Sequence, residues 1–279
     1  MGRVLLIGVD DQTARGLAEA PELEGCSFQK ASGEVDALRR LRRASFDVVI
    51  TNPASTLEAD VALVEEIRRV RRAAKVILLA PQATPAGVIA ALQAHVFACF
   101  GAPYEPAEIA RMARQAIDAV DWRDDIEVVS ALPNWLSVRV TSKALTAERL
   151  VAFLNEIPSE LKEAERDRLL LAFREILLNA MEHGAGFGSD EHIEVAAVHT
   201  ERTIVFYVHD PGPGFATESL DHAAVANPDD DPLAHAARRA EMGLRPGGFG
   251  ILLAKKIVDE LIYNQAGNEV LMIKHLDPS

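Results

Sequence analysis

Apolar residues in the first 120 positions occur in short runs separated by segments of helical period. The runs predict five strands, at Arg3–Val9, Ser27–Lys30, Phe46–Thr51, Lys75–Ala80 and Val96–Phe100. The segments between and after them predict helices near Thr13–Ala20, Val35–Arg43, Leu57–Arg72, Pro85–Ala94 and Pro106–Val120. Strands rich in Val, Ile and Leu that alternate with helices indicate a parallel sheet covered on both faces. Residues 1–120 are therefore expected to form a five-stranded doubly wound α/β domain, with functional groups at the carboxyl ends of its strands.

The periodicity then breaks down in a polar, acidic stretch, residues 121–134, which we interpret as a linker. Beyond it the pattern predicts a second domain over residues 135–279. Its expected elements are a strand at Trp135–Val140, a helix capped by Thr146, strands at His192–Val198 and Thr203–His209, a helix at Phe249–Leu261 and a strand at Val270–His275. Residues 216–244 are polar and lack a strand pattern, so we expect a mobile lid there.

The stretch Asp167–Gly184, read at helical period, separates into an apolar and a polar side. One face of this predicted helix is apolar and is expected to pack in the core; it consists of Leu169, Phe173, Ile176, Leu177 and Ala180. The other face is a polar stripe made of Arg168, Glu175, Asn179 and Glu182. A polar stripe alone is typical of a solvated helix face. Its functional interest comes from two glycine-rich stretches later in the chain, Asp210-Pro-Gly-Pro-Gly214 and Arg245-Pro-Gly-Gly-Phe-Gly250.

These three pieces together resemble the Bergerat (GHKL) ATP-binding fold shared by gyrase-like ATPases, histidine kinases and bacterial anti-sigma-factor serine kinases. The spelling Glu175-x-x-x-Asn179-Ala180-x-x-His183 resembles the anti-sigma-factor kinase subgroup in particular. The resemblance covers roughly Trp135 to Leu276. It implies an α/β sandwich that binds ATP and Mg²⁺.

The first of the glycine stretches is expected to bind the base. Asp210 is acceptor-only when ionised, so it can accept the amino group of adenine and reject the carbonyl of guanine. Gly212 and Gly214 would let the backbone pass close beneath the base, although a sequence of this kind also makes an ordinary turn.

The resemblance assigns the helix residues to the phosphate end of the nucleotide. It makes Asn179 a ligand of Mg²⁺ and Glu175 the general base for a hydroxyl nucleophile or water. His183 fits the motif as a cofactor-binding residue, and it also fits a purely structural role at a helix end. Gly247, Gly248 and Gly250 precede a helix whose free N–H groups suit a triphosphate. Arg245 could contact phosphate or pair with the acidic lid, and both interpretations stay open.

The first domain resembles response-regulator receiver domains, with departures where their chemistry takes place. Asp10 and Asp11 follow the first strand, as the acidic metal-binding pair of receivers does. Asn52, however, occupies the position of the phosphorylated aspartate, and a neutral amide is no nucleophile for phosphate. Ala80 replaces the switching Thr or Ser, and Ala102 replaces the lysine before Pro103. We expect a pseudo-receiver that cannot be phosphorylated. Whether its acidic pair binds Mg²⁺ or is merely solvated stays open.

Composition narrows the environment and the partners. The chain has 279 residues and a formal net charge of -13, which argues against direct binding of nucleic acid. Two arginine clusters, near residues 39–43 and 68–72, lie on predicted amphipathic helices and are interpreted as solvated faces. The two cysteines and the absence of an apolar run of ~20 residues favour a cytoplasmic protein without a membrane span.

The sequence supports two functions. The first is an ATP-dependent serine/threonine kinase of a protein partner, regulated by the pseudo-receiver; by resemblance the partner is an anti-sigma-factor antagonist or a sigma factor. The second is an ATP-gated interaction module or scaffold without phosphoryl transfer. Both resembling families often form dimers, so a homodimer is among the expected assemblies. A response regulator phosphorylated on aspartate is disfavoured by Asn52.

Overall fold

The computed structural model describes residues 2–52, 57–81, 83–157, 160–188, 190–214 and 250–276. The chain divides into two compact units. The first comprises Met1–Asp124 with Ala152–Pro158, and the second comprises Asp125–Val151 with Ser159–Ser279. Among the helices in these ranges, none has the length and apolar character needed to cross a membrane.

The first unit is built on a parallel sheet of five strands in the order β2-β1-β3-β4-β5. The strands are β1 (Arg3–Ile7), β2 (Ser27–Ala31), β3 (Val48–Thr51), β4 (Lys75–Ala80) and β5 (Ala98–Gly101). The side chains of β1, β3, β4 and β5 are mostly buried, and β3 is buried at every position, whereas the edge strand β2 buries only Ala31. Burial of both faces explains why these four strands appear in the sequence as apolar runs without alternation. All five predicted strands are confirmed.

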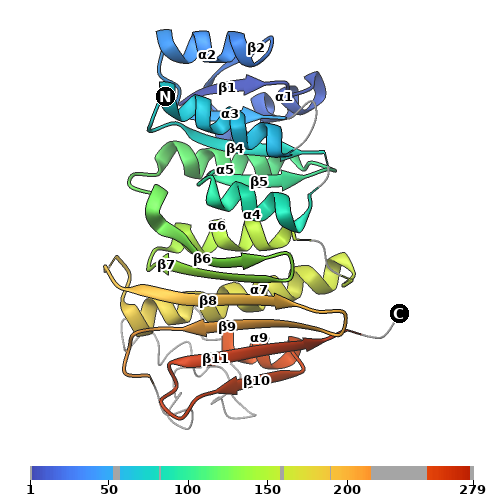
Figure 1. Ribbon diagram of the computed structural model, residues 1–279, viewed down its shortest axis with the longest axis vertical. Helices are drawn as coiled ribbons and strands as arrows, with labels where there is room; N and C mark the ends of the chain where they lie inside the picture. The colour runs from blue at the N-terminus through green and yellow to red at the C-terminus, as the bar shows by residue number, and fades with distance from the viewer. Residues whose placement is uncertain are drawn as a thin grey trace. The chain divides into compact units, whose positions relative to one another are not determined.

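Helices cover both faces of this sheet (Figure 1). On one face α1 (Asp11–Glu19) packs against α5 (Pro106–Asp118), with the 3₁₀ turn η1 (Pro21–Leu23) beside them. On the other face α2 (Glu34–Arg43), α3 (Leu57–Val70) and α4 (Pro85–Gln93) pack side by side. The strand order and the two helical layers are those of the doubly wound flavodoxin-like architecture. The expected fold class of the first domain is confirmed.

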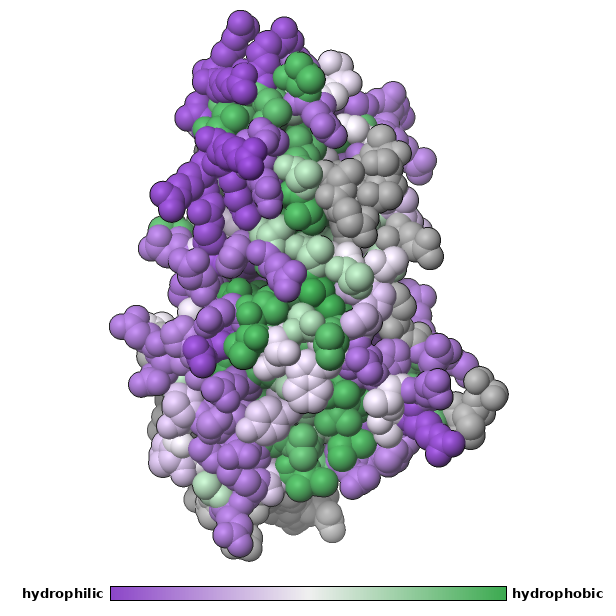
Figure 2. Space-filling view, viewed as in Figure 1, coloured by the Kyte–Doolittle hydropathy of each residue, from purple (hydrophilic) through white to green (hydrophobic). Residues whose placement is uncertain are grey.

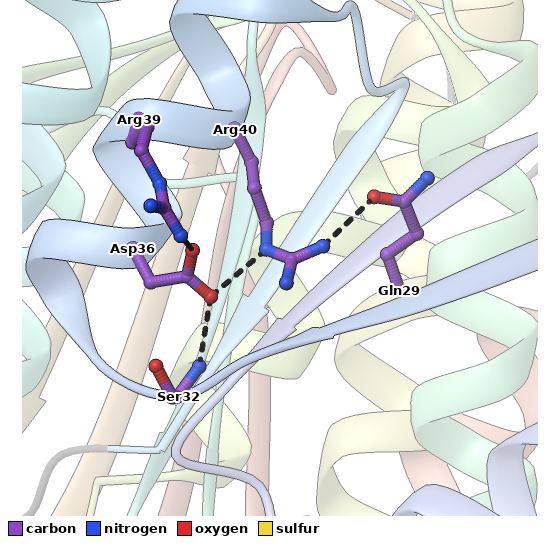
Figure 3. A network of polar contacts seen from close by, with 5 residues as sticks. All are labelled: Gln29, Ser32, Asp36, Arg39 and Arg40. Carbon is purple, nitrogen blue, oxygen red and sulfur yellow. Dashed lines mark hydrogen bonds and ion pairs between the residues drawn. The ribbon is translucent and has the colours of Figure 1, made fainter.

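The arginines of α2 are partly neutralised within their own helix (Figure 3). Asp36 accepts hydrogen bonds from Arg39 and from Nε of Arg40 (2.9 Å), and also from the backbone N–H of Ser32 (3.2 Å). These bonds hold the pKa of the Asp36 carboxyl well below its usual range. Arg40 also donates to Oε1 of Gln29 at 3.3 Å. The contacts agree with the interpretation of this cluster as a solvated helix face rather than a nucleic-acid site.

The second unit contains an antiparallel sheet of six strands in the order β10-β11-β9-β8-β7-β6. The strands are β6 (Ile126–Leu132), β7 (Trp135–Thr141), β8 (His192–His199), β9 (Thr203–His209), β10 (Glu260–Tyr263) and β11 (Glu269–His275). Its helices are the part of α6 (Ala144–Asn155) that ends at Val151, α7 (Glu163–Asn179) with the π-helical continuation η3 (Ala180–Ala185), and α9 (Gly250–Ile257). Phe173 of α7 stacks on Phe206 of β9, with ring centroids 4.6 Å apart, so α7 packs directly on the sheet. This helix-covered sheet is the expected α/β sandwich.

Three local expectations differ from the structure. Residues 121–134 contain the 3₁₀ turn η2 (Arg123–Asp125) and strand β6, where a linker was expected. Strand β6 lies at the sheet edge with only Ile126 buried, so it has no hydrophobic alternation to detect. The helix expected to reach Leu261 ends at Ile257, and β10 follows it. Thr146 is not a helix cap but a fully buried residue of the first turn of α6, 3.2 Å from the Thr141 hydroxyl.

Candidate functional site

The polar stripe lies on α7, as the sequence predicts. All five residues of the predicted apolar face are buried, which fixes the rotation of the helix against the sheet. Glu175 and Asn179 are then half-buried on the opposite side of the helix. After Asn179 the helix widens into the π-helical segment η3, which carries His183 and Gly184. A π-helical turn within an α-helix is often found at functional sites.

Glu175 and Asn179 meet the first residue of α9. A β-carbon at Gly250 would lie 3.0 Å from Cβ of Glu175, 3.2 Å from Nδ2 of Asn179 and 3.4 Å from Oε2 of Glu175. Only a residue without a side chain lets α9 begin so close to the stripe. The free N–H groups at the start of a helix carry partial positive charge. The structure therefore brings a carboxylate, an amide and a helix N-terminus together, as the motif predicted for Glu175, Asn179 and Gly250.

Arg174 holds one oxygen of Glu175. Its Nη1 donates to Oε1 of Glu175 at 2.9 Å, and its Nε donates to Oε1 of Glu148 on α6 at 2.8 Å. The Glu148 hydrogen bond, together with the charges of the two glutamates, raises the pKa of the Arg174 guanidinium, although its partial burial opposes this. Because Arg174 holds Oε1, Oε2 is the oxygen of Glu175 that faces Gly250. The sequence motif does not include this pair of hydrogen bonds, because Glu148 lies on α6 and is distant from Arg174 in the sequence.

A second cluster surrounds Asp210, which follows the last residue of β9 and is 9% exposed. Oδ1 of Asp210 accepts a hydrogen bond from the N–H of Gly212 at 2.9 Å. Gly184 of η3 packs against the same carboxylate, because a β-carbon there would lie 2.1 Å from Cγ and Oδ1 of Asp210. A β-carbon at Gly212 would in turn lie 2.6 Å from the carbonyl oxygen of Gly184. The two glycines thus form a close-fitting wall around the Asp210 carboxylate.

The turn between β10 and β11 packs against the Asp210–Gly214 segment. Oδ1 of Asn264 accepts hydrogen bonds from the N–H groups of Gly267 and Asn268 at 2.7 and 3.1 Å. Nδ2 of Asn268 lies 3.3 Å from the carbonyl oxygens of both Asp210 and Gly212. Gly214 has a φ of +74°, and a β-carbon there would lie 1.8 Å from the carbonyl oxygen of Ala266. The turn residues had no place in the predicted motif. An Asn-rich turn between two strands would have been the signal, had β10 been recognised.

Burial dominates the electrostatics of this cluster. It raises the pKa of the Asp210 carboxyl, while the Gly212 hydrogen bond and the charge of His209 act in the opposite direction. Burial also raises the pKa of the Tyr263 phenol, and the Asp210 charge raises it further. Within the described ranges, Oδ2 of Asp210 accepts no hydrogen bond. A buried carboxylate with one oxygen left over is suited to accept a donor from a ligand.

The two clusters lie along one continuous helical segment. Glu175 and Gly184 are nine residues apart, a rise of about 13 Å at helical geometry. A base held at Asp210 would therefore have its phosphates directed toward Asn179 and the start of α9. The closely packed glycines, the available carboxylate oxygen and the oxygen-bearing side chains fit ATP and a hard cation such as Mg²⁺.

The remaining predicted site residues are not tested by this geometry. His183 lies on η3 with an exposed side chain, so its role stays a prediction. Arg245, Gly247 and Gly248 fall outside the described residues, as does the expected lid at 216–244.

In the first unit the acidic pair has structural partners. Asp10 caps α1: its Oδ1 accepts from the N–H of Thr13 (2.8 Å), its Oδ2 accepts from the Thr13 hydroxyl (2.7 Å), and these bonds lower its pKa. Asp11 pairs with Lys30 at 2.5 Å, and this contact lowers its pKa as well. Asn52 directly follows β3. Among the described residues, no group of three or more His, Cys, Asp or Glu side chains is placed to hold a metal.

Comparison with protein families supports the assignment of the second unit. Residues 140–274 match the model of the histidine kinase-like ATPase domain. The match spans α7, the Asp210 turn and the start of α9, and it confirms the expected resemblance to a GHKL-type ATP-binding domain. The narrower resemblance to anti-sigma-factor kinases is not decided by it. No curated protein matches the chain.

Solved structures similar to the chain include several response regulators. A response regulator from Thermotoga maritima is 20% identical, covers 43% of this chain and 99% of its own, and has a TM-score of 0.39. A CheY-like receiver domain protein from Methanospirillum hungatei JF-1 is 18% identical over 42% of this chain and 94% of its own, with a TM-score of 0.37. A receiver domain protein from Clostridium thermocellum is 21% identical over 42% and 95%, also with a TM-score of 0.37.

Proposed function

We propose that this protein is a signalling kinase that binds Mg-ATP in its second unit and phosphorylates a serine or threonine hydroxyl of a partner protein. A histidine kinase-like ATPase domain implies ATP binding, and the match at 140–274 covers the residues of both clusters. The observation that carries the further step to phosphoryl transfer is the position of Glu175. It lies beside Asn179 at the start of α9, and in this proposal it acts on the nucleophile rather than on the base.

In this proposal Asp210 recognises adenine. Its Oδ1 is held by the Gly212 N–H, so Oδ2 accepts the exocyclic amino group of the base. Gly184 and Gly212 keep the carboxylate from turning away. Guanine presents a carbonyl oxygen at the same place, which an ionised carboxylate repels.

At the other end of the nucleotide, Asn179 would hold Mg²⁺ through its amide oxygen, and the metal would supply charge neutralisation at the phosphates. The N-terminus of α9 would direct backbone N–H groups toward the same charge. Glu175 takes the proton from the attacking hydroxyl on Oε2, while Arg174 keeps Oε1 engaged and the carboxylate oriented. Arg174 is thus a positioning residue for the base.

The partner is expected from the resemblance to the anti-sigma-factor kinases: an antagonist protein with a phosphorylatable hydroxyl, or a sigma factor. The first unit would regulate that interaction without being phosphorylated, because Asn52 follows β3 where receivers carry the phosphorylated aspartate.

The test combines binding and transfer. Titration calorimetry with ATP, with and without Mg²⁺, measures binding. Transfer of γ-³²P from ATP to a panel of purified anti-sigma-factor antagonists measures chemistry. We expect Asp210→Asn to lose both, and Glu175→Gln to keep ATP affinity within about twofold while transfer falls by about 100-fold or more. Equal transfer by the wild type and Glu175→Gln would contradict the proposed base.

A second function is favoured by the contact between Arg174 and Glu175. An ion pair occupies one oxygen of the proposed base, and such a carboxylate can serve to sense nucleotide without catalysing transfer. In this alternative ATP gates a protein interaction, and the chain is a scaffold. Mg²⁺-dependent binding of ATP without transfer to any antagonist, and without slow release of ADP, would favour the alternative.

A further inference from the structure

Ser142 continues the buried side of strand β7. Leu136, Val138 and Val140 alternate along the strand and are buried on the side of the sheet that packs against α7. Because α7 lies behind the strands in Figure 1, the other side of the sheet is the one seen in Figure 2, where apolar side chains gather over the strands. Ser142 comes next in the buried series and is 0% exposed. A hydroxyl group buried this deeply is normally hydrogen-bonded.

Two hydrogen bonds of Ser142 bracket the π-helical segment η3. The Ser142 hydroxyl donates to the carbonyl oxygen of Met181 at 2.9 Å, near the start of the segment. The carbonyl oxygen of Ser142 accepts from the N–H of Gly188 at 2.8 Å, three residues after the segment ends. Ser142 thus ties both ends of residues 181–188 to the end of β7.

The π-helical spacing of η3 decides which way Gly184 faces. Gly184 lies nine residues after Glu175, which is about two and a half turns of an α-helix, so in an unbroken α-helix the two residues would face opposite sides. A π-helical segment bonds residue i to residue i+5 and needs more residues per turn, so each residue advances the rotation by less. Gly184 is therefore rotated away from that opposite side, and it packs against the Asp210 carboxylate.

The contact between Gly184 and Asp210 does not tolerate a change in helical register. A shift by one residue rotates a helical position by about 100° and moves its Cα atom by about 3.5 Å, given a helix radius of about 2.3 Å. The fit in the structure is much closer than that, because a β-carbon at Gly184 would lie 2.1 Å from Cγ of Asp210. A β-carbon at Gly212 would likewise lie 2.6 Å from the carbonyl oxygen of Gly184. Whatever fixes the register of η3 therefore also fixes the surroundings of the Asp210 carboxylate.

We propose that Ser142 is a positioning residue for the recognition of adenine. Its two hydrogen bonds fix η3 in the π-helical register that sets Gly184 against Asp210. Ser142 acts through η3 and not by contact with the nucleotide. The inference rests on the proposed function, because it takes Asp210 as the acceptor of the adenine amino group. It adds to that function a residue that lies outside all three sequence motifs.

The first test is the single substitution Ser142→Ala. It removes the hydroxyl, deprives the Met181 carbonyl oxygen of this buried donor and lets η3 relax toward α-helical spacing. Calorimetric titration of the full chain with ATP and Mg²⁺ should show an affinity lowered by about tenfold, because Asp210 keeps its charge but loses its close-fitting surroundings. ATP affinity equal to that of the wild type would overturn the inference.

Thr146→Val is the matched control. Thr146 is also 0% exposed, and its hydroxyl lies 3.2 Å from that of Thr141, so its hydrogen-bond partner is on β7 rather than on η3. The substitution should lower the urea midpoint, as Ser142→Ala does, while ATP affinity stays within about twofold of the wild type. An equal loss of ATP affinity in both variants would identify general destabilisation as the cause, and the role of Ser142 would be refuted.

A double-mutant cycle with Gly184→Ala tests the route of the effect. If Ser142 acts by setting Gly184 against Asp210, a variant that has already lost this fit should lose no further affinity through Ser142→Ala. With single effects of about tenfold and about thirtyfold, the double variant should bind ATP about thirtyfold more weakly than the wild type, rather than about 300-fold. Effects that multiply would show that Ser142 does not act through Gly184, which contradicts the inference.

The wild type separates failure of this inference from failure of the proposed function. A wild-type chain that does not bind ATP would refute the proposed function, and this inference with it. Binding by the wild type and equal binding by Ser142→Ala would refute the inference alone. If Ser142→Ala does not fold, Ser142→Cys takes its place, because a thiol is a weaker donor than a hydroxyl. The cysteine variant should bind ATP more weakly than the wild type, and unchanged affinity would again refute the inference.

Discussion

Gly184→Ala tests the Asp210 cluster with one methyl group. The new β-carbon would lie 2.1 Å from Cγ and Oδ1 of Asp210 and 2.5 Å from its Cβ. Carbon atoms in contact are normally about 3.5 to 4 Å apart, so the Asp210 side chain must move by more than roughly 1 Å. Such a movement would break the 2.9 Å hydrogen bond that the Gly212 N–H donates to Oδ1 of Asp210. The substitution therefore displaces the Asp210 carboxylate from the position in which it is proposed to bind adenine, without removing the carboxylate itself.

The expected magnitudes follow from these contacts. Overpacking a tight site costs about 1–3 kcal/mol, and alanine gains about 1 kcal/mol over glycine in a helix. The free energy of unfolding should therefore fall by roughly 0–2 kcal/mol. Losing the charge-assisted hydrogen bond to adenine should weaken ATP binding by about 2 kcal/mol, or roughly thirtyfold.

The assay is ATP titration calorimetry at a temperature where urea unfolding shows both proteins fully folded. Gly33→Ala is the control, because a β-carbon there meets nothing within 4 Å. It should bind ATP as the wild type does. If Gly184→Ala binds ATP with wild-type affinity, Gly184 does not hold Asp210 in place and the proposed base-binding geometry is wrong.

Three further predictions address pH, the base and the buried charges. Because burial raises the pKa of Asp210 above its ordinary 3.8, acidification should protonate it, and weaken ATP binding, at a higher pH than for an ordinary aspartate; ATP affinity that stays constant as the pH falls through the acidic range would contradict the role of the Asp210 carboxylate. Arg174→Gln should lower the rate of transfer by roughly tenfold with little change in ATP affinity, and Arg174→Lys should restore part of the rate, whereas a merely structural role would alter unfolding but not this split. Asp125 is 3% exposed and forms an ion pair with Lys143 at 2.7 Å, near the buried Arg149, whose pKa is lowered by burial to about 10. Asp125→Asn should therefore reduce the free energy of unfolding, measured in urea, by about 2 kcal/mol. An unchanged urea midpoint would show that the Asp125 charge does not stabilise these two cations.

Short-range pattern determined much of this protein. The apolar runs of the first 120 residues located β1, β3, β4 and β5, because a strand buried on both faces leaves a nearly unbroken apolar run; the edge strand β2 was located as well, although it buries only Ala31. The helical period of Asp167–Gly184 identified the buried face of α7 and, with it, the direction of Glu175 and Asn179. The motif at Asp210 marked a turn of special geometry. These features depend on residues within a few positions of one another.

Only the tertiary structure decided which distant groups meet. Gly184 packs against the Asp210 carboxylate, and Arg174 donates hydrogen bonds to both Glu148 and Glu175. These contacts form because the fold brings separate elements together. Strands β6 and β10 escaped detection since they are the edge strands of the sheet, where few side chains are buried and alternation is lost. Local period is encoded within one segment, whereas pairing and packing are set by the free energy of the whole domain.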